Sequence, residues 1–186
     1  MSILPSIRKV SLRGILPGLL LLFCSMTIPA NQEGDTTSES TVKALFIYNF
    51  TKHIEWPANA MNLPRFTIIT LGENDVKERL LTVMKGRRVF EKPVEVHSIN
   101  EPSEINGAQI LYIGKSQSAV AEKVIQQYGD KGILIITEDK GMNTKGAGIN
   151  LIRKGDNLRF EINEAALRKA GLKVSNQLIS LAISSR

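Results

Sequence analysis

Hydrophobic residues recur every three or four positions from Thr41 onward, which is the spacing of an amphipathic helix. The stripe consists of Val42, Leu45, Phe46, Asn49, Phe50, His53 and Ile54. Trp56 and Pro57 follow. A proline disfavours helical backbone at the residue before it. We therefore expect a helix that ends at this dipeptide, with Phe46, Phe50 and Trp56 anchoring it in the core.

Runs rich in β-branched residues alternate with helical patterns in the middle of the chain. The expected strands are 66–71, 109–113 and 132–137, with less regular candidates at 87–90 and 94–99, and the expected helices are 75–84 and 116–128. The run 132–137 is the most apolar of these, as is usual for an interior parallel strand that is covered on both faces.

The C-terminal third predicts a hairpin followed by helices. Two short runs, 149–152 and 158–162, flank the turn at Gly155. Asn163 can cap a helix over 164–169, and a final helix is expected over 173–183.

This order of elements predicts a single α/β domain over 41–186. We expect a mixed, largely parallel, Rossmann-like sheet of about five or six strands, with helices on both faces and a C-terminal hairpin with helices.

The first thirty residues have the layout of a secretory signal peptide. Arg8, Lys9 and Arg13 precede an apolar run, 15–23, and small and turn-forming residues lead to Ala30. That run is shorter than the ~20 residues of a membrane-spanning helix. Cleavage after Ala30 is therefore favoured over a permanent anchor, and the polar stretch 31–40 is expected to be a flexible lead-in.

The single cysteine, Cys24, leaves a second possibility open, because lipidation of exported bacterial proteins uses a cysteine that follows a short aliphatic run. Phe23 occupies the position where a small residue is expected. Under the favoured alternative Cys24 is removed with the leader, and the mature chain then has no thiol for a disulfide or a metal site.

Removal of the leader also changes the charge. The formal net charge falls from +6 to +3, because residues 1–30 contain three basic and no acidic residues. No basic tract with interleaved aromatic residues remains, so nucleic acid is not an expected partner.

Catalytic signatures are absent from the sequence. The two histidines, His53 and His97, have no metal-binding spacing. The glycine-rich stretch 141–148 leads into a strand, whereas a phosphate loop precedes a helix, so Gly146 and Gly148 are interpreted as turn and packing residues. We therefore expect no enzyme activity, no metal and no cofactor.

Two of the polar or aromatic residues have two interpretations each, and two others have one simplest role. Trp56 is either a core plug or the rim of a cleft. Asn49 either fixes the first helix to a loop or lines a pocket, and His53 is expected to pack its ring locally. Glu161 lies between two residues that face the core, so a solvent-facing strand carboxylate is its simplest role.

Two segments carry a family resemblance: 42–57, with the sequence VKALFIYNFTKHIEWP, and 146–163, with GAGINL followed by FEIN. The block that includes AGLKVSNQLISLA, 170–182, extends it. In this order the segments resemble the YfiR family, also represented by HmsC, over essentially all of the chain after the leader.

The resemblance implies a periplasmic α/β domain, commonly a homodimer, that restrains a diguanylate cyclase by binding the periplasmic part of this membrane-anchored enzyme. Release of the restraint would raise cyclic di-GMP and promote biofilm formation. Ala147 replaces the second glycine of the usual pair, and the disulfide-forming cysteines of some members are absent. Redox control of the kind that such cysteines allow in those members is therefore not expected of this chain.

The expected partner or ligand surface combines the Trp56 corner with the C-terminal block. Packing alone does not require the polar residues that the family pattern places there. The candidate residues are Trp56, Phe160, Glu161, Asn163 and Gln177. A contrasting hypothesis is a sensor domain for a small molecule, with Trp56, Phe160 and Glu161 around a pocket.

Overall fold

The structure is a computed structural model that describes residues 33–72 and 74–183. The expected leader and Cys24 lie outside the described residues. Within the described part, no helix is both long enough and apolar enough to cross a membrane.

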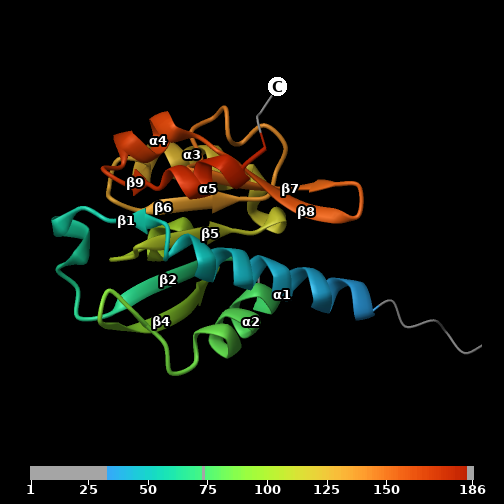
Figure 1. Ribbon diagram of the computed structural model, residues 1–186, viewed down its shortest axis with the longest axis horizontal. Helices are drawn as coiled ribbons and strands as arrows, with labels where there is room; N and C mark the ends of the chain where they lie inside the picture. The colour runs from blue at the N-terminus through green and yellow to red at the C-terminus, as the bar shows by residue number, and fades with distance from the viewer. Residues whose placement is uncertain (1–32, 73, 184–186) are drawn as a thin grey trace, which may run out of the picture. The chain divides into compact units, whose positions relative to one another are not determined.

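A seven-stranded sheet forms the centre of the domain, with the strand order β3-β4-β2-β5-β6-β7-β8 (Figure 1). Its strands are β2 (Phe66–Leu71), β3 (Arg88–Val89), β4 (Lys92–Ile99), β5 (Ile110–Ile113), β6 (Leu134–Thr137), β7 (Ile149–Lys154) and β8 (Asn157–Ile162). The inner pairs are parallel, and the pairs β3 with β4 and β7 with β8 are antiparallel. The expected mixed, largely parallel sheet is confirmed, with seven strands where about five or six were expected.

Strand β6 lies between β5 and β7, and all four of its residues are buried. This confirms the interior parallel position that the apolar run predicted, since both faces of such a strand are covered.

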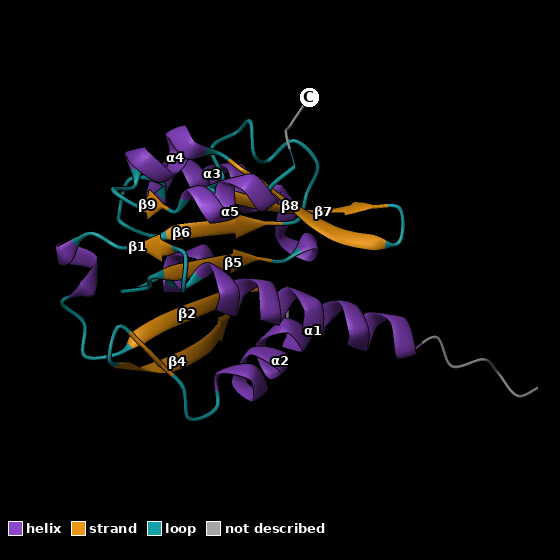
Figure 2. Cartoon of the chain, viewed as in Figure 1, coloured by secondary structure: helices purple, strands orange, loops and turns teal. Residues whose placement is uncertain are grey.

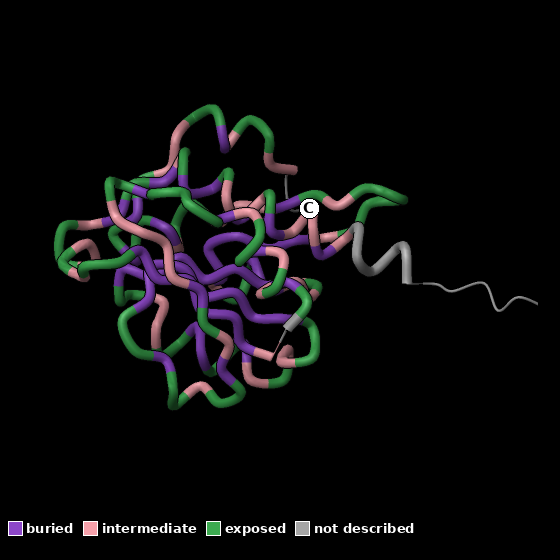
Figure 3. Tube along the Cα trace, turned by 90° about the horizontal axis from the view of Figure 1, so that it is seen from below, coloured by how far each residue is buried: buried purple, intermediate pink, exposed green. Residues whose placement is uncertain are grey.

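Helices cover both faces of the sheet (Figure 2). They are α1 (Glu33–Phe50), α2 (Asn74–Met84), α3 (Ser118–Tyr128), α4 (Glu164–Lys169) and α5 (Asn176–Leu181), with short 3₁₀ turns at Ala58–Met61, Pro102–Glu104 and Lys115–Gln117. The core residues of α1, α2, α4 and α5 belong to one buried cluster, and those of α3 belong to a second cluster on the opposite face. The buried segments gather along the strands, while the connecting loops are exposed (Figure 3).

Helix α1 differs from its prediction at both ends. It begins at Glu33, so the helix occupies part of the expected lead-in, and it ends at Phe50. Residues 51–53 form a turn, and Ile54 starts the two-residue strand β1 (Ile54–Glu55). The cause is long-range: β1 pairs antiparallel with β9 (Lys173–Val174), which removes its backbone from the helix.

The buried face of α1 is also rotated from the expected stripe. Ala44, Ile47 and Phe50 are almost fully buried, whereas Leu45 is 44% exposed. Asn49 is exposed as well, so neither of its expected roles holds.

The C-terminal elements are confirmed in part. The hairpin β7–β8 and helix α4 form as expected, and the side chain of Asn163 accepts a hydrogen bond of 2.9 Å from the backbone nitrogen of Ala166. The expected helix over 173–183 is wrong at its start, because β9 occupies Lys173–Val174 and Ser175 caps the shorter α5.

The glycine-rich loop has the packing role that its sequence indicated. Gly146 has a φ of +104°, which favours glycine, and a Cβ on Gly148 would lie 2.7 Å from Leu167. The loop therefore allows α4 to approach the sheet closely.

Candidate functional site

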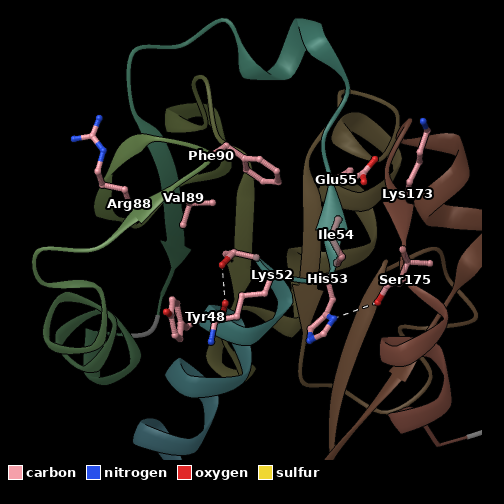
Figure 4. Close-up of a pocket in the computed structure, with 12 residues that line it drawn as sticks. Tyr48, Lys52, His53, Ile54, Glu55, Arg88, Val89, Phe90, Lys173 and Ser175 are labelled. Atoms are coloured by element: carbon pink, nitrogen blue, oxygen red, sulfur yellow. Dashed lines mark hydrogen bonds between the residues drawn. The ribbon is translucent and has the colours of Figure 1, made fainter.

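A pocket of about 490 Å³ opens where the end of α1, the β1–β9 pair and the β3–β4 turn meet (Figure 4). It is lined by Tyr48, Thr51, Lys52, His53, Ile54, Glu55, Arg88, Val89, Phe90, Lys173, Val174 and Ser175. Its volume lies within the range of sites for small molecules, about 300–1,000 Å³.

One wall of the pocket is aromatic. Phe90 is 48% exposed, and in Figure 4 its ring points from the β3–β4 turn toward the space between the walls. The ring lies 6.1 Å from that of Trp56, which makes an edge contact of 5.1 Å with Phe66. A row of three rings thus runs from the core to the pocket.

The turn that holds Phe90 is strained. Phe90 and Glu91 have φ values of 48° and 59°, and these are the only non-glycine residues with positive φ in the described chain. The left-handed conformation costs an L-residue roughly 1–2 kcal/mol. The chain tolerates this cost at a position where it presents an aromatic ring to the surface.

Cations dominate the rim of the pocket. Lys52 lies 4.1 Å from the ring centre of Tyr48, and Arg87 lies 4.3 Å from the same ring and donates a hydrogen bond of 2.6 Å to its hydroxyl. Arg88 and Lys173 stand on opposite sides of the opening (Figure 4). Among the described residues that line the pocket, Glu55 is the only acidic one. The pocket is therefore suited to an anionic group next to an apolar or aromatic one.

His53 has a structural partner at the base of the pocket. Its Nδ1 lies 3.2 Å from the hydroxyl of Ser175, and its carbonyl accepts a hydrogen bond of 2.9 Å from the backbone nitrogen of Ser175. The same hydroxyl caps α5 by accepting a hydrogen bond from Leu178. The pair thus fixes the end of α1 to the start of α5, as expected of a histidine that packs locally.

The described residues contain no group of three or more His, Cys, Asp or Glu side chains that could hold a metal ion.

Two of the five candidate residues lie in the core. Trp56 is 8% exposed, and its indole nitrogen donates a hydrogen bond of 2.8 Å to the carbonyl of Gln109, as suits a core plug. Phe160 is 5% exposed and makes edge contacts with Phe46 and Phe50 of α1.

The three polar candidates occupy different places. Glu161 is half-buried and accepts a hydrogen bond of 3.2 Å from Asn150, on the sheet face opposite to Phe160. Asn163 caps α4 and donates to the carbonyl of Asn143. Gln177 is exposed on α5. The five residues do not form one cluster, and none of them lines the pocket, although Trp56 touches Phe90 at its edge.

A chain of ion pairs fixes α1 to the sheet away from the pocket. The ammonium of Lys43 lies 2.6 Å from Glu138, which follows β6, and 3.1 Å from Glu39, which also pairs with Arg153 of β7. Burial lowers the pKa of Lys43, but Glu138 and Glu39 outweigh this effect and raise it. Burial likewise raises the pKa of Glu39, but Lys43 and Arg153 outweigh it and lower that pKa.

The pocket could not be predicted from the sequence, because its walls come from three segments that are far apart in the chain. Lys52 and Lys173 lie near each other only through the pairing of Ile54 with Val174. The one local signal was Phe90, a large aromatic residue in a charged turn between two β-rich runs.

A family model described as YfiR/HmsC-like matches residues 40–183. The match begins within α1 and ends just after α5, so it covers all the strands of the sheet and all of its connections.

Proposed function

Because this chain belongs to the YfiR/HmsC-like family, we propose that it is a periplasmic regulator that binds and represses an inner-membrane diguanylate cyclase. Binding to the periplasmic part of the enzyme lowers cyclic di-GMP and restrains biofilm formation. The protein acts by binding and not by catalysis.

The family match carries this proposal. A fold alone does not indicate a function, because one architecture hosts many. Here the match covers every strand of the sheet and all the loops between them, including segments that a shared architecture leaves free to vary. A regulatory role for the family supports the general function, and the cyclase as partner is the specific step that we propose.

The surface of α5 is suited to a protein partner. Gln177 and Leu181 lie four residues apart, and side chains at this spacing share one face of a helix. Leu181 is 59% exposed, an unusual position for a large apolar side chain at the end of a short helix. We place the partner contact on this face, with Glu161 as a second contact on β8.

A second candidate function follows from the pocket at the end of α1. An anionic small molecule bound beside Phe90, Lys52 and Lys173 would favour one conformation of the domain and thereby shift the equilibrium with the partner. In this case the protein senses a metabolite. The two functions are compatible, because Ser175, which caps α5, also lines the pocket and contacts His53 there.

The test compares strains that lack the gene or carry a variant of it. Deletion should raise cellular cyclic di-GMP and surface attachment, and the wild-type gene should restore repression. The change Gln177→Ala combined with Leu181→Ser should restore it incompletely, and so should Glu161→Ala, with normal amounts of exported protein.

Gln126→Ala is the matched control, because this glutamine is exposed on α3, outside the proposed surface. Unchanged cyclic di-GMP after deletion would reject the proposed role. Full repression by both the combined variant and Glu161→Ala would keep the role and reject the surface.

A further inference from the structure

The segment between α2 and β4 carries the excess positive charge of the domain. After the first thirty residues the chain has a formal net charge of +3. Residues 85–93, which we call the basic turn, contain four basic residues and one acidic residue, so the rest of 31–186 is balanced. The four are Lys85, Arg87, Arg88 and Lys92. A charge excess confined to one surface of an otherwise balanced domain favours an anionic partner at that surface.

Two cations from other elements enlarge this surface. Lys52, which follows α1, and Arg87 lie against one ring, that of Tyr48, at 4.1 and 4.3 Å from its centre. Lys173 of β9 faces Arg88 across the opening of the pocket (Figure 4). Among the described residues, Lys52, Arg87 and Lys173 form no ion pair with a carboxylate. Like charges held together repel, and an anion placed over them relieves the repulsion.

Exposed apolar side chains stand among these cations. Phe90, in the basic turn, is 48% exposed, and Leu81 of α2 is 43% exposed. Leu81 lines a groove of about 360 Å³ with Lys85, Arg87 and Arg88, and the described lining of this groove contains no acidic residue. Arg88 also lines the neighbouring pocket, together with Phe90. Cations thus alternate with large apolar side chains, as on surfaces that lie at the boundary between lipid headgroups and acyl chains.

The backbone of the basic turn holds Phe90 at the surface against its conformational preference. Its φ of 48° lies in the left-handed region, which asparagine and glycine adopt more readily than phenylalanine. One edge of the ring lies against Trp56, with 6.1 Å between ring centres, but about half of the side chain is exposed. Stability of the fold does not require an exposed ring on strained backbone. Contact with an apolar medium outside the protein gives the ring a role.

We propose that the basic turn, with Lys52 and Lys173, binds the surface of an anionic phospholipid bilayer. The cations contact the phosphates of the headgroups, and Phe90 and Leu81 enter the boundary with the acyl chains. An acidic protein segment would also match the charge. The observations favour the bilayer, because the cations come from separate elements and the two apolar side chains lie in separate hollows on either side of Arg88. A broad, fluid surface contacts both hollows at once.

Binding to lipid vesicles tests the proposal, with protein produced from its full-length gene. Trp56 is the single tryptophan and lies beside Phe90, so energy transfer from Trp56 to a dansyl-labelled lipid reports binding. Vesicles of phosphatidylcholine with about 30% phosphatidylglycerol should bind at least about tenfold more tightly than vesicles of phosphatidylcholine alone. Added salt should reduce this difference, because it screens exposed charges. Inorganic phosphate should not displace the vesicles, since it offers no apolar contact.

Three variants separate this surface from a general attraction between charges. Arg87→Gln combined with Arg88→Gln should weaken binding to the anionic vesicles about 25-fold, because each cation near such a surface contributes about fivefold. Lys115→Gln combined with Lys123→Gln is the matched control, since it removes the same charge from exposed positions elsewhere and should change binding less than about twofold. Phe90→Asn should weaken binding about fivefold without lowering the urea midpoint, because asparagine tolerates the left-handed backbone.

Equal binding to neutral and anionic vesicles, or equal losses in the two double variants, would overturn the proposal. Displacement by inorganic phosphate would also overturn it, because the cations would then serve a soluble anion. Binding of polyglutamate without binding of vesicles would replace the bilayer with an acidic protein segment. Vesicles contain no cyclase, so these results do not depend on the function proposed above.

Discussion

The substitution Phe50→Ala probes the packing of α1 on the sheet. Phe50 is 1% exposed, and its ring lies 6.0 Å from that of Phe46 and 5.2 Å from that of Phe160. Truncation of a buried phenylalanine costs about 3–5 kcal/mol. We expect the upper part of this range, because two aromatic contacts of ~0.5–1.5 kcal/mol each are lost as well.

Leu45 provides the matched control on the same helix. It belongs to the apolar stripe of the sequence, yet it is 44% exposed, so Leu45→Ala should change the free energy of unfolding by less than about 0.5 kcal/mol. Urea denaturation measures both, with fluorescence of the single tryptophan, the buried Trp56, as the signal. Equal losses in the two variants would refute the orientation of α1.

Three further predictions concern charge, the core and the leader. Although burial raises it, the pKa of Glu39 is lowered overall by Lys43 and Arg153, so its stabilising effect is present above the ordinary value of 4.5 and is lost as pH falls through the lowered one. The urea midpoint should therefore fall on acidification, and fall less in Glu39→Gln. The Tyr112 hydroxyl is buried without a hydrogen-bond partner among the described residues, so Tyr112→Phe should leave stability unchanged or raise it by up to ~2 kcal/mol, measured by the same denaturation. Mass spectrometry of a periplasmic extract should find an N-terminus near Asn31, whereas a lipidated cysteine in the membrane fraction would contradict signal-peptide cleavage.

The regular elements of this fold could be predicted because their signals are local. The strand Phe66–Leu71 and the helix Glu164–Lys169 have the bounds that their patterns indicated. The end of α1 could not be predicted, since the hydrophobic stripe continues to Ile54 while the pairing of Ile54 with Val174 ends the helix early. That pairing joins residues that are far apart in the chain, and no local pattern encodes it.

The candidate site could likewise be predicted only where the signal is local in the sequence. The cap at Asn163 was predictable from one residue and its position before a helix. The pocket was not, because Phe90, Lys52 and Lys173 converge only after the sheet and the β1–β9 pair have formed. The motifs of the sequence indicated the family. The structure shows which of the proposed contact residues are exposed on the surface, and Gln177 is the clearest case.

Capture of the partner tests the central proposal most directly. The tagged protein is expressed from its own gene, and membranes are solubilised and purified on the tag, with the combined Gln177→Ala and Leu181→Ser variant in parallel. We predict that mass spectrometry identifies a membrane protein with a diguanylate cyclase domain in the wild-type sample, and much less of it with the variant. Recovery of no such cyclase, together with tight binding of a metabolite by the purified protein, would contradict the proposal.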